Sequence, residues 1–79
     1  MIKTIAKLER LRLSVNGNPR FRVTFTDGAV MQTQTDAMIG YSIENLEYRD
    51  VPLHVSTSHA GRITDLVPAG HGEAAHTEA

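Results

Sequence analysis

The chain has 79 residues, a net charge of −1 and no cysteine. This length fits one small domain, which buries only about 60% of the surface that its unfolded form exposes. The lack of cysteine excludes disulfide bonds, thiolate metal sites and a cysteine nucleophile. We therefore expect the fold to be stabilised by packing or by self-association into a homo-oligomer. No stretch approaches the roughly 18 apolar residues that span a bilayer, and the N-terminus lacks a signal-peptide core. The sequence predicts a cytoplasmic protein that does not bind membranes.

Charge is distributed unevenly along the chain. Residues 1–22 contain six Lys and Arg residues and one acid, a net charge of +5, whereas residues 23–79 have a net charge of −6. Such asymmetry indicates either a charged partner or head-to-tail contacts between copies of the chain.

Residues 3–15 form the first expected strand. From Leu11 to Val15, apolar and polar residues alternate with the period of a half-buried strand. The earlier apolar residues are out of phase with this alternation, which favours a β-bulge near residues 8–10. The apolar positions also fit the period of a helix. We favour a strand because a tight turn at residues 16–19 leads directly into the next strand.

The clearest pattern in the sequence is a β-hairpin. Residues 20–26 alternate strictly between polar and apolar side chains, and residues 29–34 form a second strand. Between them lies the pair Asp27-Gly28, which is a strong hairpin signal because glycine accepts a positive φ.

Two registers of this hairpin are possible. A two-residue turn pairs Val23 with Gln32 and buries glutamine side chains, and an unpaired buried amide costs roughly 1–3 kcal/mol. A turn with Gly28 as a left-handed bulge residue pairs Val23 with Met31 instead. We choose the bulged turn because it buries fewer amides.

The rest of the chain contains two more expected strands. Residues 35–51 lack a clear period, and within them residues 42–48 form either a short helix capped by Ser42 or an ordered loop. Residues 52–57 and 62–67 follow the pattern of strands.

These elements define the expected fold class, which is mainly β. We expect a small five-stranded meander in an SH3-like, partly open barrel, with one long loop or short helix between strands 3 and 4. Residues 1–67 would form this domain. Residues 68–79 contain no large apolar side chain, so we expect them to be a flexible polar tail.

The expected register of the first hairpin, with Leu13 opposite Phe21, gathers like charges on the outer face of the sheet. That face would hold the rows Arg12–Arg22–Gln32 and Ser14–Arg20–Gln34, with Lys7 and Arg10 on the same N-terminal sheet. Like charges that face each other destabilise a sheet, whereas arginine binds phosphate and carboxylate groups. The face is therefore either a docking surface for nucleic acid or an acidic protein, or a solvated face neutralised by Glu44, Glu47 or Asp50.

Aromatic side chains add little to the nucleic-acid hypothesis. Phe21 and Phe25 alternate with the arginines and point into the core, whereas single-strand binders place stacking rings beside their basic groups. Tyr41 and Tyr48 either stack on a base or a partner protein, or cover the small core with their hydroxyls in water.

No motif of catalysis or cofactor binding occurs in the sequence. His71 and His76 lie in the tail, where a preformed metal site is not expected. The Ser and His residues near residue 58 lack a nucleophile elbow, and no P-loop, Rossmann or zinc spacing is present. We expect no catalytic residue, cofactor, metal or small-molecule substrate.

Several segments resemble a family of short proteins that are encoded by bacteriophages of actinobacteria and by their hosts. The resemblance lies in residues 15–28 (VNGNPRFRVTFTDG) and in the segments QTDA, YSIEN, EYR and AGRI that begin at residues 34, 41, 47 and 60. It spans about residues 4 to 66. It implies a phage or prophage accessory protein in a bacterial cytoplasm, and it assigns no functional residue, because no activity is established for the family.

The sequence therefore predicts a non-enzymatic interaction module that binds a protein partner or itself. The alternative is a nucleic-acid-binding accessory protein that uses the basic face of the N-terminal sheet. The candidate partner-binding residues are Lys7, Arg10, Arg12, Arg20, Arg22, Gln32, Gln34, Tyr41 and Tyr48.

Overall fold

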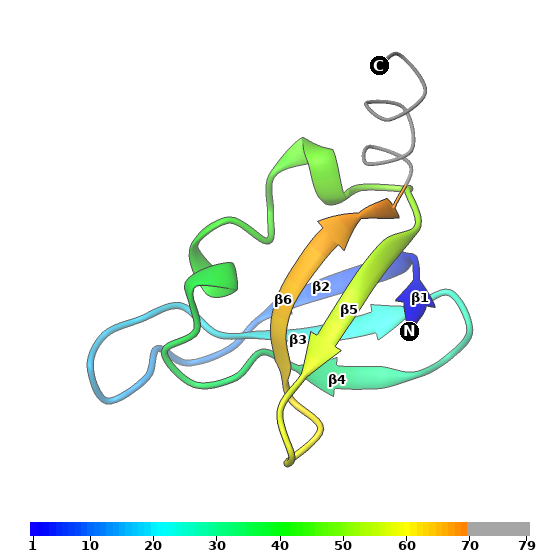
Figure 1. Cartoon of the computed structure of the whole chain (residues 1–79). Coiled ribbons are helices and arrows are strands. Elements are labelled where there is room, and N and C mark those ends of the chain that lie inside the picture. The colour runs from blue at the N-terminus through cyan, green and yellow to red at the C-terminus, as the bar shows by residue number, and fades with distance from the viewer. Residues whose placement is uncertain (70–79) are drawn as a thin grey trace, which may run out of the picture.

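A computed structural model describes residues 1–69, which form two three-stranded antiparallel sheets (Figure 1). The strands are β1 (Ile2–Lys3), β2 (Ile5–Arg10), β3 (Phe21–Phe25), β4 (Val30–Gln32), β5 (Leu53–Thr57) and β6 (Ile63–Pro68). One sheet has the order β1-β5-β6 and the other the order β2-β3-β4. The mainly β class is confirmed. The five-stranded meander is wrong, because the described residues contain six strands divided between two sheets.

The two sheets are linked at two corners. Only Thr4 separates β1 from β2, so one nearly continuous strand leaves the first sheet and enters the second; the Thr26 N–H donates to the Thr4 carbonyl over 2.8 Å. At the other corner Thr33 and Ile63 form an isolated parallel bridge, and the Gln34 N–H donates to the Ile63 carbonyl over 2.7 Å. This bent first strand explains why the expected single strand over residues 3–15 becomes two.

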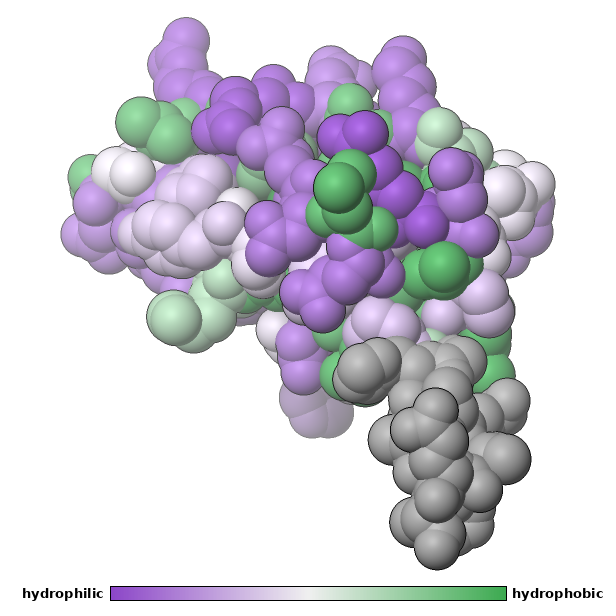
Figure 2. Space-filling model, turned by 90° about the horizontal axis from the view of Figure 1, so that it is seen from above, coloured by the Kyte–Doolittle hydropathy of each residue, from purple (hydrophilic) through white to green (hydrophobic). Residues whose placement is uncertain are grey.

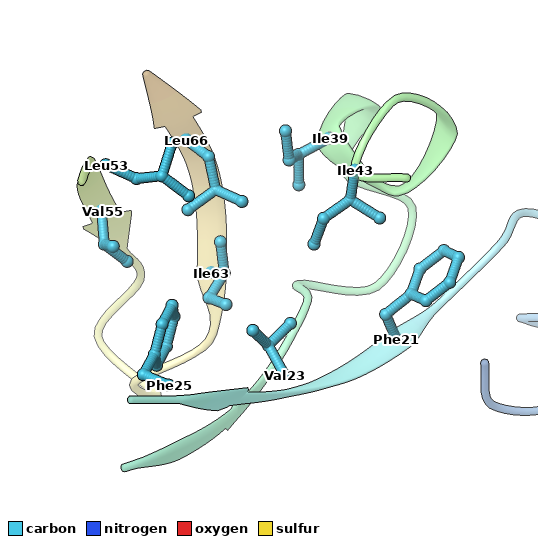
Figure 3. Packing of buried hydrophobic residues seen from close by; sticks show 9 residues of the cluster. All are labelled: Phe21, Val23, Phe25, Ile39, Ile43, Leu53, Val55, Ile63 and Leu66. Carbon is cyan, nitrogen blue, oxygen red and sulfur yellow. The ribbon is translucent and has the colours of Figure 1, made fainter. Parts of the chain in front are cut away.

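The hydrophobic core lies between the two sheets and the segment that follows β4 (Figure 3). Alternation along β3 directs three of its side chains inward, as the sequence pattern predicts. The buried apolar residues are Phe21, Val23, Phe25, Ile39, Ile43, Leu53, Val55, Ile63 and Leu66.

The β3–β4 hairpin has the bulged register that the sequence favours. Val23 pairs with Met31, and Gly28 has a φ of 91°. The Gly28 N–H donates to the Phe25 carbonyl, and the Phe25 N–H donates to the Ala29 carbonyl, both over 2.9 Å. The hairpin therefore depends on a glycine in a conformation that other residues rarely adopt.

The predicted register of the β2–β3 hairpin is wrong. Leu8, rather than Leu11, pairs with Val23, and the bulge lies between Ile5 and Lys7 instead of near residues 8–10. In the observed register the out-of-phase apolar residues of β2 face the core, where Ile5 and Leu8 pack against it. Burial of these two side chains explains the shift, because the alternating residues that follow belong to a loop.

Two short 3-10 helices, η1 (Met38–Tyr41) and η2 (Leu46–Tyr48), occupy the long connection between β4 and β5. The expected helical turns at residues 42–48 are present only in part, and Ser42 is not an N-cap, because η2 begins after Asn45. From this connection Ile39 and Ile43 reach the core.

The last two strands are found where the sequence predicts them, although β6 extends to Pro68. The Ala69 N–H donates to the Pro52 carbonyl over 2.9 Å. The rest of the expected flexible tail, residues 70–79, lies outside the described residues. No helix within residues 1–69 is long and apolar enough to cross a membrane.

Candidate interaction surfaces

An ion pair occupies the outer face of the β2-β3-β4 sheet, where the sequence predicts two arginines opposite each other. Glu9, not Arg12, pairs with Arg22, and Gln32 completes the row. The Arg22 Nη1 donates to the two Glu9 carboxylate oxygens over 3.2 and 3.1 Å. The expected like-charge cluster is therefore absent from this row, because the register shift replaces one arginine with an acid.

Arg10 lies at the edge of the core rather than on the outer face. It pairs with Phe21, and its guanidinium lies 5.0 Å from the centre of the Phe21 ring. Its Nη2 donates to a Glu44 carboxylate oxygen over 2.6 Å. The alternative in which acids of the long connection neutralise the arginines thus holds for Arg10, although both side chains are exposed and such pairs contribute little to stability.

The second predicted row, Ser14–Arg20–Gln34, is also dispersed. The Arg20 Nε donates to the Arg12 carbonyl over 3.0 Å, and the Gln34 side-chain oxygen accepts from the Ser58 hydroxyl over 3.2 Å. Lys7 is exposed and pairs with Thr24 in the sheet. Lys7 therefore shares the outer face with Arg22 and Gln32, whereas neither of the two predicted rows is formed.

A cluster of hydrogen bonds around Asp36, which we call the Asp36 clasp, joins the loop after β2 to the turn after β4. The Asp36 carboxylate accepts from the Ser14 hydroxyl over 2.6 Å and from the Asn18 and Asn16 side-chain amides over 2.8 and 2.9 Å. Asp36 has a φ of 63°, a conformation that aspartate tolerates better than most residues. The hydrogen bond from Ser14, followed by those from Asn18 and Asn16, lowers the pKa of Asp36.

Sequence reasoning missed this clasp. The Asn-Gly-Asn-Pro stretch predicts a tight turn, and it gives no indication that its side chains bind an aspartate 18 residues later. The one signal in the sequence is that this short stretch contains three side chains that readily form hydrogen bonds in turns, Ser14, Asn16 and Asn18.

Large apolar side chains are exposed next to the clasp. The exposed fractions are 52% for Leu13, 80% for Met38 and 60% for Tyr41, and Val15 is fully exposed. We call these four residues the tip surface. The Tyr41 hydroxyl donates to the Asn18 side-chain oxygen, so η1 and the first loop belong to the same end of the molecule. Isolated exposed apolar residues are ordinary, but several of them on one ordered region are typical of an interaction site.

A second surface of interest is an open groove of about 430 Å³ along β2. Residues 5–8 of β2 form one wall, and Ile43, Glu44 and residues 48–50 line the other. Tyr48, which the sequence places in the same candidate set as Tyr41, lies in this groove and packs against the core. The two tyrosines therefore belong to different surfaces.

Within residues 1–69, no group of three or more His, Asp or Glu side chains is arranged so that it could hold a metal ion. No family model, curated protein or solved structure matches the chain. Each surface is therefore judged from its own geometry.

Proposed function

We propose that the chain is a non-enzymatic interaction module that binds a protein partner through the tip surface. The observation that carries this proposal is the exposure of Leu13, Val15, Met38 and Tyr41 on two segments that hydrogen bonds hold together. Figure 2 shows apolar residues scattered among polar ones on the face seen from above.

The polar groups of the tip have partners within the chain. The Asp36 carboxylate accepts three side-chain hydrogen bonds, and Asn18 both donates to Asp36 and accepts from Tyr41. A loop that is ordered before binding loses less conformational entropy when it binds. The tip therefore offers a partner preorganised apolar contacts, which favours protein over phosphate as the ligand.

Binding of nucleic acid is the alternative function. Arg10 and Arg22, two of its central residues, each have an acidic partner in the chain. Lys7 and Arg12 are exposed, but they lie on a strand and on a loop that do not form the expected row. This arrangement supports phosphate binding less well than a cluster of unpaired cations on one face.

The biological setting of the proposal comes from the resemblance described above. We propose a phage or prophage accessory protein that acts in a bacterial cytoplasm. We also propose that the two linked sheets correspond to an SH3-like, partly open barrel.

The experiment replaces Val15 with a photoreactive phenylalanine analogue and crosslinks the chain in an actinobacterial lysate. The captured protein is then purified, and its affinity is measured for the wild type, for Val15→Ser/Met38→Ser and for the control Val30→Ser. Val30 is also exposed but lies on β4, away from the tip. We expect the double variant to bind at least about tenfold more weakly, because contacts of this kind contribute more than about 1 kcal/mol at interaction hot spots.

The same affinities, measured at low and at physiological salt, distinguish the two functions. The affinity for a protein bound through apolar contacts should change little with salt, whereas the affinity for phosphate falls steeply. Equal affinity of the double variant and the wild type would contradict the tip surface. Salt-sensitive binding of labelled DNA or RNA, lost in Lys7→Glu/Arg12→Glu, would favour the nucleic-acid function instead.

A further inference from the structure

Strand β2 has one free edge. It lies at the end of its sheet and is hydrogen-bonded only to β3 among the strands of residues 1–69. The Leu11 N–H donates to the Arg20 carbonyl, so the backbone groups of Leu11, and of Glu9 and Lys7 before it, point toward β3. Because these directions alternate along a strand, the N–H and C=O groups of Leu8 and Arg10 point toward the free edge.

The neighbouring segment leaves this edge open along residues 5–8, and at Arg10 it is reached only by the exposed Arg10–Glu44 ion pair. The groove of about 430 Å³ lies between residues 5–8 and the segment that contains residues 43–50. After the bulge, the four residues from Lys7 to Arg10 pair regularly with β3 and therefore form a regular edge. The free edge of β4, by contrast, belongs to a strand of three residues. An exposed regular edge is a template for another strand.

We propose that β2 pairs in antiparallel fashion with β2 of a second copy of the chain, about a two-fold axis at Leu8. The two Leu8 residues would then exchange both of their outward hydrogen bonds, as a hydrogen-bonded pair of an antiparallel ladder does. The two β2-β3-β4 sheets would join into one continuous sheet of six strands. Such an interface is isologous, with the same patch used on both copies.

Charge complementarity identifies the second copy as the occupant. In this register Lys7 lies opposite Glu9 of the second copy, and Glu9 opposite Lys7 of the second copy. Each Glu9 would then lie between that lysine and its own Arg22, which it already contacts over 3.1 Å. Opposite charges that face each other across strands stabilise a sheet. A lysine on an edge ordinarily discourages pairing, but here the residue that meets it is an acid.

Other two-fold registers of the same edge are less favourable. A centre at Arg10 would place two arginines opposite each other and lose both Lys7–Glu9 contacts. A centre at Lys7 or Glu9 would make that residue a non-hydrogen-bonded pair, which the backbone allows, but it would align two lysines or two glutamates. The Leu8 register alone satisfies both the hydrogen bonds and the charges.

This inference goes beyond the proposed function, because it names a second copy of the chain as a partner at a surface distinct from the tip. The test is sedimentation equilibrium of the full chain from about 10 µM to about 1 mM, the range of weak dimers. We expect the mass to rise from that of a monomer to that of a dimer. Lys7→Glu and Glu9→Lys should each weaken the dimer by about tenfold or more, because an attractive pair becomes repulsive at two symmetric positions.

Mixing the two charge variants provides the decisive measurement. In an equimolar mixture, the Lys7→Glu chain presents acids at both positions, and these face the lysines that the Glu9→Lys chain presents at the same two positions. A mixed dimer should therefore form at wild-type concentrations. The double variant Lys7→Glu/Glu9→Lys should also recover the dimer in one chain. Arg12→Glu, which makes the same charge change on the loop outside the strand, is the matched control and should dimerise as the wild type does.

Three outcomes would overturn the edge pairing: a wild type that stays monomeric at about 1 mM, a Lys7→Glu variant that dimerises normally, or a mixture that does not recover. Val15→Ser/Met38→Ser separates this inference from the proposed function. If that variant loses its protein partner but still dimerises, both surfaces stand; if the wild type is monomeric yet binds its partner through the tip, only the edge pairing fails.

Discussion

The two hairpins that share β3 are built by different means, although both look alike in the sequence. The β3–β4 hairpin closes through Asp27 and Gly28, and its register follows from the turn itself: the Asp27 carboxylate accepts from the Ala29 N–H over 2.9 Å, and Gly28 has a positive φ. The β2–β3 hairpin closes through a ten-residue connection between Arg10 and Phe21 that ends the strand early. Its loop is held by Asp36, which belongs to neither strand.

The two hairpins differ in what determines the register of their strands. In the β3–β4 hairpin, residues in the turn determine which side chains face each other, so local reasoning is sufficient. In the β2–β3 hairpin, register depends on burial of Ile5 and Leu8 against the core and on contacts of the loop with η1 and with Asp36. Four predictions, from the largest expected effect to the smallest, test this contrast.

Phe25→Ala should cost about 3–5 kcal/mol, which is comparable to the whole free energy of unfolding of so small a domain. Phe25 is fully buried on β3, the strand on which both hairpins depend. Thermal unfolding followed by circular dichroism measures the effect, with Val30→Ala, at an exposed position of β4, as the control. A thermal midpoint within a few degrees of the wild type would show that the shared strand does not carry the core.

The sequence is informative wherever a pattern is local. Alternation locates β3, β5 and β6, and the Asp27-Gly28 pair selects the correct bulged turn. The same rule misleads at Leu13 and Val15, whose alternation belongs to an exposed loop rather than to a strand. Alternation reports the local period and not which residues the rest of the chain covers.

The candidate surface was predictable only in part, for the same reason. Arg22 and Gln32 do share a row, because the turn of their own hairpin sets that pairing. The first hairpin's wrong register also misplaces Arg12, and Tyr41 belongs to the tip surface for a reason that the sequence does not reveal, its contact with Asn18. Register errors thus propagate directly into predicted binding faces.

Gly40→Ala should destabilise the chain by about 1–3 kcal/mol, the usual cost of adding a methyl group where there is no room. A Cβ atom at this position would lie 2.4 Å from the Pro19 backbone oxygen, so η1 and the first loop would have to separate. The free energy of unfolding from urea titration measures the cost. Gly28→Ala is the informative comparison, because its Cβ would meet nothing within 4 Å and its cost comes from the backbone conformation alone.

If Gly40→Ala is neutral, the loop and η1 are not packed as described, and the β2–β3 connection has no tertiary support at this point. Hydrogen exchange at residues 13–18 should rise in Gly40→Ala and stay unchanged in Gly28→Ala.

Asp36→Asn should remove a pH-dependent part of the stability. The hydrogen bond from Ser14, with those from Asn18 and Asn16, holds the folded-state pKa of Asp36 below its ordinary value of 3.8. A lowered folded pKa means that the contribution is fully present above the unfolded pKa and is lost as the pH falls through the folded pKa. The wild type should therefore exceed Asp36→Asn in stability at pH 7, and the difference should shrink below about pH 4.

Asp27→Asn is the control for where in the molecule this effect lies. A hydrogen bond from Lys3 and one from the Ala29 N–H also lower the pKa of Asp27. Both variants should flatten the acid limb of the stability profile. Only Asp36→Asn should increase hydrogen exchange at residues 13–18, since Asp27 lies in the other hairpin. Increased exchange there in both variants would mean that the two loops are coupled.

Arg22→Gln should have the smallest effect, a loss of about 0.5 kcal/mol or less, because its ion pair with Glu9 is exposed and screened by solvent. The value of the experiment lies in the coupling energy. A double-mutant cycle with Glu9→Gln should give a small favourable coupling between positions 9 and 22, whereas a cycle with Arg12→Gln should give none. In the register expected from the sequence, Arg12 and Arg22 would face each other, and removing either charge would stabilise the sheet. A gain in stability in Arg22→Gln, with coupling to residue 12, would therefore support the register expected from the sequence. Glu9 would then not lie opposite Arg22, and the proposed pairing of two β2 edges would lose its basis.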